Sequence, residues 1–345
     1  MRRMFILLLL AAACGGPPAA SVSSTTLAGA TDSLTIPDLD ISGAVPVGKD
    51  RWAVLSQFSN VVKVVDWDRH TVRPLGRPGV DYVHPSSITA VDGTLYVTDW
   101  GKRRLTAWGP DGKLALTIAA PDALGGLLPT ARDGDGWLYA ESRSGQLDSG
   151  SVLRWRVGAP HPDTVARLAP YTMQEVNGPQ GRRLVRQIYS GNDIWGVLAS
   201  DAIWVARVTK NRLDLRDTTG RWHQGPALPD PIYPVTRFDK DYFVEGFPED
   251  QRQMAGALPF APVKAPFDGA FVEDDSVVWL QSSRNLTDSI RTYKVLDRSG
   301  AFAHEVRLKN ARRILGAHGG MLLVAEQLDP GKGFKLLRYP SAGIP

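Results

Sequence analysis

The sequence offers little for covalent or metal-based chemistry. Cys14 is the single cysteine among 345 residues, so an intrachain disulfide is excluded. None of the six histidines lies at a spacing typical of zinc ligands. The chain has no G-x-S-x-G nucleophile motif, and no G-x-G-x-x-G motif follows a strand and opens a helix. We therefore expect no cofactor and assign no catalytic residue.

An excess of charge and a long hydrophobic run are also missing. The 40 basic residues nearly balance the 36 acidic ones, so the formal net charge is only +4. Such a small surplus gives no electrostatic case for binding nucleic acid. The apolar run Phe5–Ala13 is nine residues long, whereas a helix that crosses a bilayer needs about 20. This run is therefore typical of a signal peptide.

The residues that follow the run predict a lipid anchor. Arg2 and Arg3 precede it, and small alanines lead directly to Cys14. The arrangement resembles the bacterial lipobox, in which the cysteine is acylated and becomes the new N-terminus. The resemblance implies lipidation at Cys14, with the membrane as a partner, and a place in the cell envelope. Gly15 favours sorting to the outer membrane, facing the periplasm or the cell surface. The alternative is an ordinary secretory signal with an incidental cysteine.

These features divide the chain into three parts. Residues 1–13 are the expected signal peptide. Residues 14–31 are mostly small or polar and include two prolines, a composition that buries little apolar surface and favours a flexible tether. Residues 32–345 are expected to form one folded domain.

The body of the chain repeats one unit. Tight turns rich in Gly and Asp precede runs of four mostly apolar residues, which are typical of buried strands. The third residues of these runs lie 43 or 44 positions apart where the spacing is regular, a period typical of propeller blades. Gaps of 65 and 75 residues each fit one blade with an insertion. The six third residues are Ala53, Tyr96, Tyr139, Trp204, Trp279 and Leu323.

The spacing of further polar turns makes each unit a four-stranded antiparallel meander. The expected fold is therefore all-β: a six-bladed β-propeller. Too few residues follow Tyr339 for a turn and another strand, so the last blade lacks its outermost strand. We expect Asp32–Ile36 to supply that strand by pairing with residues 334–339, which would close the ring with an N-terminal strand.

The longest gap contains the clearest segment without strand character. Pro248, Glu249 and Asp250 predict the start of a short helix that runs to about Leu258, followed by an extended stretch to Phe267. This 238–267 insertion is interpreted either as a lid or partner platform or as a decorated connection between two blades.

One blade carries a recognisable motif. His84-Pro85, the run from Gly93 to Asp99, and Pro110-Asp111-Gly112 together resemble an NHL-type propeller repeat. Residues 259–339 resemble the closing blades of bacterial six-bladed propeller proteins with NHL-like repeats. The resemblance implies the fold; most members of this class bind or scaffold, whereas the gluconolactonase and lyase types are enzymes.

In a four-stranded meander, the loops that follow the second strands and the loops that enter the first strands open at the same mouth of the channel. Charged and aromatic residues of these loops suit an anionic or carbohydrate-like ligand. The alternative interpretation is a solvated rim, and the Arg312-Arg313 pair is likewise expected to be exposed. The candidate ligand-binding residues are Tyr82, His84, Trp100, Lys102, Arg143, Arg207, Lys210 and Arg284.

The function expected from these features is a non-enzymatic binding or scaffold protein anchored to the envelope. Its ligand would be a small molecule, a glycan or a protein. The alternative is a metal-dependent lactonase or hydrolase of the gluconolactonase type. In that type a divalent ion is held in the channel, and Asn192, Asp193 and Asp268 are the candidate ligands here, although the first blade offers no matching carboxylate.

Overall fold

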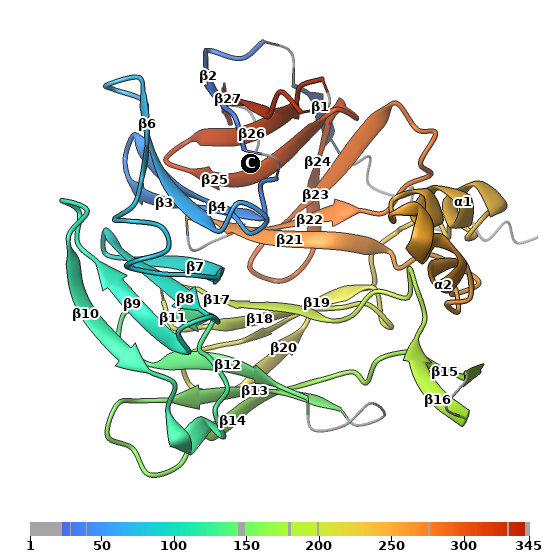
Figure 1. The fold of residues 1–345 in the computed structure, drawn as a ribbon, viewed down its shortest axis with the longest axis horizontal. Helices are drawn as coiled ribbons and strands as arrows, with labels where there is room; N and C mark the ends of the chain where they lie inside the picture. Colours follow the sequence, from blue (N-terminus) through green and yellow to red (C-terminus); the bar gives the residue numbers. More distant parts are fainter. Residues whose placement is uncertain are drawn as a thin grey trace, which may run out of the picture.

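The computed structural model describes residues 23–341, except residues 28, 39, 144–148, 179–180, 199, 275–276 and 330. Cys14 and the expected signal peptide lie outside the described residues. Within them, six antiparallel four-stranded blades surround one axis (Figure 1), and the last two blades are joined into one nine-stranded sheet through the pairing of Glu273 with Ala317. The innermost strands of the six sheets contact one another in sequence, and the last contacts the first, so the ring is closed. The predicted six-bladed propeller is confirmed.

Blades 1 to 3 follow one another along the chain, each running from its innermost to its outermost strand. Blade 1 contains β3 (Gly43–Gly48), β4 (Arg51–Ser56), β5 (Val61–Asp66) and β6 (Thr71–Pro74). Blade 2 contains β7 (Pro85–Val91), β8 (Thr94–Asp99), β9 (Arg104–Trp108) and β10 (Leu114–Ala119). Blade 3 follows the short 3-10 helix η1 (Asp122–Leu124) and contains β11 (Ala131–Arg132), β12 (Leu138–Ser142), β13 (Gly150–Trp155) and β14 (Asp163–Leu168).

Blades 4 to 6 complete the ring. Blade 4 contains β17 (Ile194–Val197), β18 (Ile203–Arg207), β19 (Arg212–Arg216) and β20 (Trp222–Gln224). Blade 5 contains β21 (Phe267–Glu273), β22 (Val277–Ser282), β23 (Ile290–Leu296) and β24 (Phe302–Lys309). Blade 6 contains β25 (Arg312–His318), β26 (Met321–Gln327) and β27 (Phe334–Pro340). The six repeat positions expected from the sequence all fall in the second strands of their blades.

The N-terminal segment closes blade 6. Strand β2 (Asp32–Ile36) pairs antiparallel with β27, with Asp32 opposite Arg338 and Ile36 opposite Phe334. The predicted closure is therefore confirmed. The preceding strand β1 (Ser23–Thr26) adds in parallel to β24 at the outer edge of blade 5. The tether expected over residues 14–31 thus does not extend to residue 31, because its last part is held against two blades.

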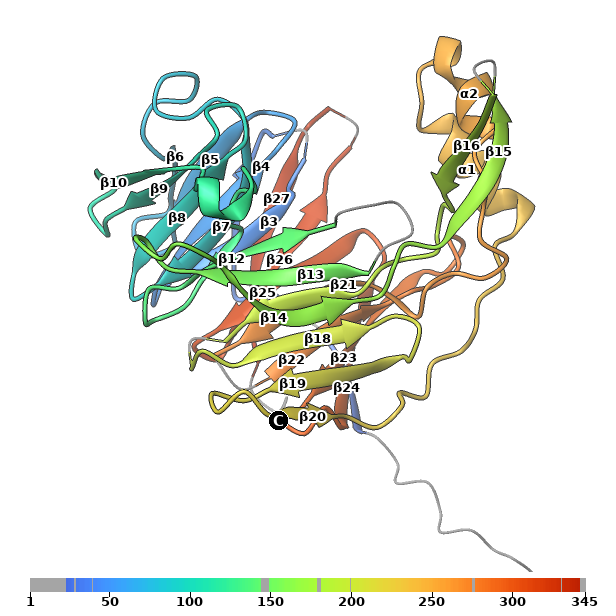
Figure 2. The ribbon, with the colours of Figure 1, turned by 90° about the horizontal axis from the view of Figure 1, so that it is seen from below.

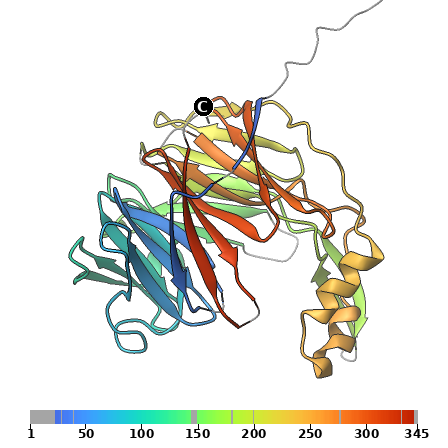
Figure 3. The ribbon, with the colours of Figure 1, turned by 90° about the horizontal axis from the view of Figure 1, so that it is seen from above.

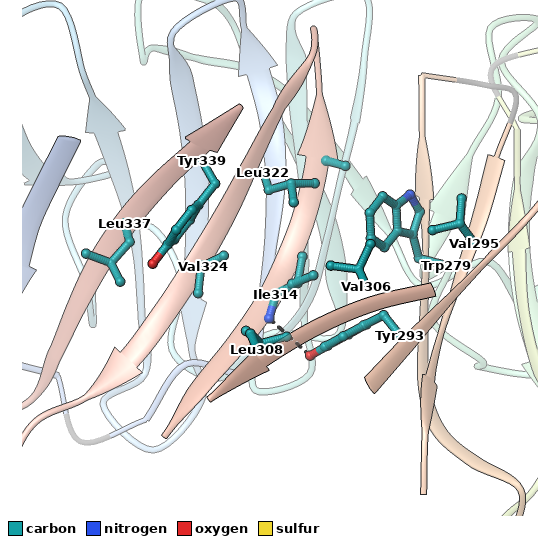
Figure 4. Packing of buried hydrophobic residues seen from close by; sticks show 11 residues of the cluster. Trp279, Tyr293, Val295, Val306, Leu308, Ile314, Leu322, Val324, Leu337 and Tyr339 are labelled. Carbon is teal, nitrogen blue, oxygen red and sulfur yellow. Dashed lines mark hydrogen bonds between the residues drawn. The ribbon is translucent and has the colours of Figure 1, made fainter. Parts of the chain in front are cut away.

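The core lies between the blades. Among the described residues, six hydrophobic clusters each join two neighbouring blades, including one between blade 6 and blade 1. Figure 4 shows the cluster between blades 5 and 6, where Trp279 and Tyr293 of one blade face Ile314 and Leu322 of the next. Each blade is too thin to bury both of its faces alone, so the stability of one blade depends on its neighbours.

Two insertions stand on the same side of the ring. The hairpin of β15 (Met173–Gly178) and β16 (Gly181–Arg186) precedes blade 4, and the helices α1 (Arg237–Glu245) and α2 (Arg252–Gly256) precede blade 5. Both replace a connection from an outermost strand to the next innermost strand. In an antiparallel meander these connections share one end of the ring with the turns between second and third strands. We call this end the upper face (Figures 2 and 3).

The helical insertion differs in part from its prediction. The expected helix at 248–258 corresponds to a 3-10 turn, η2 (Glu249–Gln251), followed by α2. Helix α1 was not predicted, although Thr236 and Asp239 form a capping box at its start. Among the described residues, neither helix combines the length and the apolar character needed to cross a bilayer.

Candidate functional site

The channel contains three adjoining cavities beside blades 5 and 6, with volumes of about 340, 580 and 530 Å³. Arg291 lines all three of them. Arg284, Arg313 and Asp268 each line two of them. We call this region the arginine site and define it by these four residues. It is the place where the blade loops and both insertions meet.

The three guanidinium groups have no acidic partner at hydrogen-bond distance in the described part of the chain. Arg284 donates to the main-chain oxygens of Asn285 and Asp288, at 3.0 and 3.3 Å. Arg291 donates weakly to a main-chain oxygen of the adjoining connection, at 3.4 Å, and its buried Nε has no partner. Arg313 donates to the main-chain oxygen of Ile41. Their positive charges are therefore directed toward the cavity without being neutralised by ion pairs.

Asp268 is the one acidic residue of the arginine site. It is the extra residue of a β-bulge in β21, which turns its side chain out of the ladder and into the channel. Gln281 donates to its Oδ1 at 2.5 Å, Tyr293 donates to Gln281 at 2.7 Å, and the Tyr293 hydroxyl accepts from the amide of Ile314 at 3.0 Å. Figure 4 shows this last bond. A chain of hydrogen bonds from blade 6 thus orients the carboxyl.

The pKa values in the arginine site reflect loss of water and crowding of charge. The protein around Asp268 displaces water and raises the pKa of its carboxyl, although Gln281, Arg291 and Arg284 act in the opposite direction. Burial and the charge of Arg291 lower the pKa of Arg284. Burial also lowers the pKa of Arg313. Asp268 lines two of the cavities and Asp40 the third, but cationic side chains outnumber the carboxyls in each cavity, and this net positive charge suits a bound anion.

The helical insertion is fastened to the arginine site by a buried ion pair. Lys264 Nζ lies 2.6 Å from Asp239 of α1 and donates to the main-chain oxygen of Arg284 at 2.9 Å. Burial opposes ionisation of Asp239, but the hydrogen bonds from Lys264 and Thr236 outweigh it and lower the pKa of the carboxyl. This contact fixes the start of α1 against the loop that carries Arg284.

The residues predicted for the channel mouth do not form one site. His84, Trp100 and Lys102 lie close together on blade 2, where the Trp100 amide donates to the His84 carbonyl. Trp100 is 65% exposed. Tyr82 is a correction: it is fully buried between blades 1 and 2, and its hydroxyl bonds the main chain of Val62. A ring packed in that core cannot contact a ligand.

The remaining predicted residues lie on other blades. Arg207 forms ion pairs with both Asp193 and Asp214 at 3.0 Å, so its charge is already neutralised within blade 4. Lys210 is exposed on the same blade. Arg143 lies on blade 3, where it pairs with Glu141 at 2.5 Å. Of the predicted ligand-binding residues, Arg284 belongs to the arginine site.

The alternative metal ligands are only partly brought together. Asn192 and Asp268 line the same cavity, where Asn192 accepts a hydrogen bond from Arg186 at 2.8 Å. Asp193 is 1% exposed, and its carboxylate accepts hydrogen bonds from Arg207 and from the amides of Ala169 and Val208. Among the described residues, no group of three or more His, Cys, Asp or Glu side chains is arranged to hold a metal ion.

Sequence reasoning missed Arg291, Arg313 and Tyr242. The Arg312-Arg313 pair was expected to be exposed, but both residues are half-buried. Arg312 pairs with Glu326 at 3.1 Å, whereas Arg313 points the other way, toward the channel. The strict alternation of side chains along a strand was the signal for this difference, since one residue of any such pair must face inward.

The comparisons with known proteins find distant structural likenesses. No protein-family model and no curated protein matches the chain, so the NHL resemblance stays a prediction. Regucalcin from Agrobacterium tumefaciens, described as a calcium-binding protein, is 12% identical, with a TM-score of 0.47 over 92% of this chain and 96% of that one. A DUF4221 member from Bacteroides vulgatus is 8% identical, with a TM-score of 0.49 over 90% and 97%. Virginiamycin B lyase from Staphylococcus aureus is 14% identical, with a TM-score of 0.41 over 89% and 83%. These values carry no argument about activity.

Proposed function

We propose that this chain is a binding protein that takes a small anion, a carboxylate or a phosphate, in its channel. The observation that carries the proposal is the arginine site: three guanidinium groups line the 530 Å³ cavity and donate to main-chain oxygens, with the carboxyl of Asp40 in that cavity and that of Asp268 in the two adjoining ones. A guanidinium group matches the oxygens of a carboxylate or phosphate with two parallel donors. An anion would relieve the mutual repulsion of the three charges.

The proposal is tested by titration calorimetry with succinate and with inorganic phosphate. Arg291→Gln and Arg313→Gln each remove a charge-assisted hydrogen bond, so we expect affinity to fall about tenfold or more. Arg237→Gln is the matched control, because this side chain of α1 is 93% exposed and lines none of the three cavities. Equal affinities for the wild type and both channel variants would refute the proposal.

Asp268 separates this proposal from the hydrolase alternative. In a binding site for anions its charge opposes the ligand, so Asp268→Asn is expected to strengthen binding. In a metal-dependent hydrolase the same change would abolish turnover. Metal analysis of the purified protein, with lactone and ester hydrolysis measured with and without calcium or zinc, distinguishes the two. Stoichiometric metal together with turnover that Asp268→Asn abolishes would favour the hydrolase.

We also propose that an acyl group on Cys14 holds the protein at the cell envelope, with the upper face away from the membrane. Strand β1 runs parallel to β24, so Ser23 lies near the start of that strand, at the end of the ring opposite the insertions. The nine residue steps from Cys14 to Ser23 span at most about 32 Å. Cys14→Ser is expected to abolish labelling by a fatty-acid probe, and unchanged labelling would refute the anchor.

A further inference from the structure

We propose that Tyr242 of helix α1 makes the arginine site selective for anions attached to an aromatic or similarly flat apolar group. This inference rests on the proposed anion site and names the class of ligand that the site prefers. The ligand would place its carboxylate or phosphate among the arginines and its ring against Tyr242.

The position of Tyr242 is the first argument. It lines the 530 Å³ cavity together with Arg284, Arg291 and Arg313, although it belongs to an insertion outside the ring. It lies close enough to Arg284 to affect the pKa of that guanidinium. Its side chain is 59% exposed, so the structure leaves a large aromatic surface uncovered at the entrance to a cationic cavity. An aromatic group on the ligand would cover that surface.

The remaining wall of the same cavity is mixed: Asp40, Asn310 and Gln327 are polar, and four other residues are apolar. Ile41 and Phe334 come from the blade 6 and blade 1 junction, and Ala311 and Ala325 come from blade 6. The cavity therefore places apolar side chains, with Tyr242 among them, beside its cationic ones. A simple inorganic anion would contact only the cationic region, whereas an anion with a ring would use both.

Helix α1 is held firmly enough to serve as a wall. Its first turn is fixed by the Thr236–Asp239 capping box and by the buried pair of Asp239 with Lys264. The Tyr189 hydroxyl donates to the main-chain oxygen of Asp239 at 3.0 Å. The ring of Phe243, the next residue after Tyr242, packs on three other aromatic rings, with centroid distances of 5.2 to 6.3 Å. Tyr242 is thus presented in place before a ligand arrives, which lowers the entropic cost of binding.

Helix α1 also contains the residue for a matched control of the Tyr242 variant. Phe238 lies one turn before Tyr242 and is similarly exposed, at 54%, but it lines none of the three cavities. Replacing either ring by alanine removes exposed aromatic surface from the same helix. Only the Tyr242 change alters the entrance to the arginine site. Neither residue is part of a buried cluster, so both variants are expected to keep the melting temperature of the wild type.

The test compares matched pairs of probes by titration calorimetry. Phenyl phosphate is compared with methyl phosphate, and phenylacetate with acetate, each against the wild type and the variants Tyr242→Ala, Phe238→Ala and Arg313→Gln. We expect each phenyl probe to bind roughly three- to tenfold more tightly than its partner. Tyr242→Ala should remove that ratio, Phe238→Ala should preserve it, and Arg313→Gln should weaken all four probes.

The outcomes separate this inference from the proposed function. If the probes bind and Arg313→Gln weakens them, but the phenyl ratio is one or survives in Tyr242→Ala, then this inference is wrong and the anion site stands. If Phe238→Ala removes the ratio as completely as Tyr242→Ala does, the wall is not specific to Tyr242 and the inference is also wrong. If no probe binds the wild type, both the inference and the proposed function fail.

Discussion

The closure of the ring through β2 predicts that one N-terminal side chain supports the whole propeller. Ile36 is fully buried in the cluster between blades 6 and 1, far in sequence from the strand it pairs with. Truncating a buried isoleucine to alanine costs about 2–5 kcal/mol. Because β2 is an outermost strand that can shift inward, we expect about 3 kcal/mol for Ile36→Ala. For a folded domain of this size that corresponds to a fall in Tm of about 4–5 °C.

The measurement is urea unfolding followed by tryptophan fluorescence, with a thermal melt in parallel. Thr35→Ala is the matched control, since Thr35 lies in the same strand but is exposed; it should cost less than about 1 kcal/mol. Gly333→Ala perturbs the same junction from the turn that precedes β27. Gly333 has φ +85°, and an added Cβ would overlap the carbonyl of Ile36. If both variants unfold like Thr35→Ala, then β2 does not support the ring.

Two further predictions concern the attached segments. Lys264→Gln leaves the buried carboxylate of Asp239 without its charged partner, which costs about 3–5 kcal/mol. Residues 232–266 should therefore become sensitive to protease. The control variant Arg237→Gln should leave them resistant. Burial lowers the pKa of His304, although Glu305 opposes this, so its neutral form is favoured in the fold. The stability this contributes is present above pH 6.5 and is lost as pH falls through the lowered pKa. His304 is hydrogen-bonded to the hydroxyls of Ser23 and Thr25 in β1, at 2.6 and 2.9 Å, so hydrogen exchange in β1 should accelerate on acidification. No change in protection, after correction for intrinsic rates, would contradict this.

Local patterns were enough to predict the blades. The regular spacing between Ala53, Tyr96 and Tyr139 reflects a unit that must repeat to bury its faces, so the period survives in the sequence. The pairing of β2 with β27 followed from counting strands. Helix α1 was not predicted because its capping residue, Thr236, follows a proline-rich stretch, which is typical of a loop.

The arginine site was harder to predict, for geometric reasons. The direction of Asp268 depends on a bulge in β21. The irregularity in β25 falls between Ile314 and Gly316, beyond Arg313, whose direction follows the regular alternation. A bulge shifts the alternation of side chains by one residue, and the sequence does not mark where it falls. The prediction that Tyr82 binds a ligand was wrong for a related reason. Its position in a loop suggested an exposed side chain, whereas the space between blades 1 and 2 accommodates its ring.

The pairing of β2 with β27 also sets an order in time. During synthesis the strand that completes the last blade is made early, and its partner is made late. Blades 1 to 5 can form from neighbouring segments, but β2 has no partner until nearly the whole chain is available. Contacts so distant in sequence form slowly, because a long loop must close first. We therefore expect ring closure to be the final step of folding, with the open edge of β27 exposed until then.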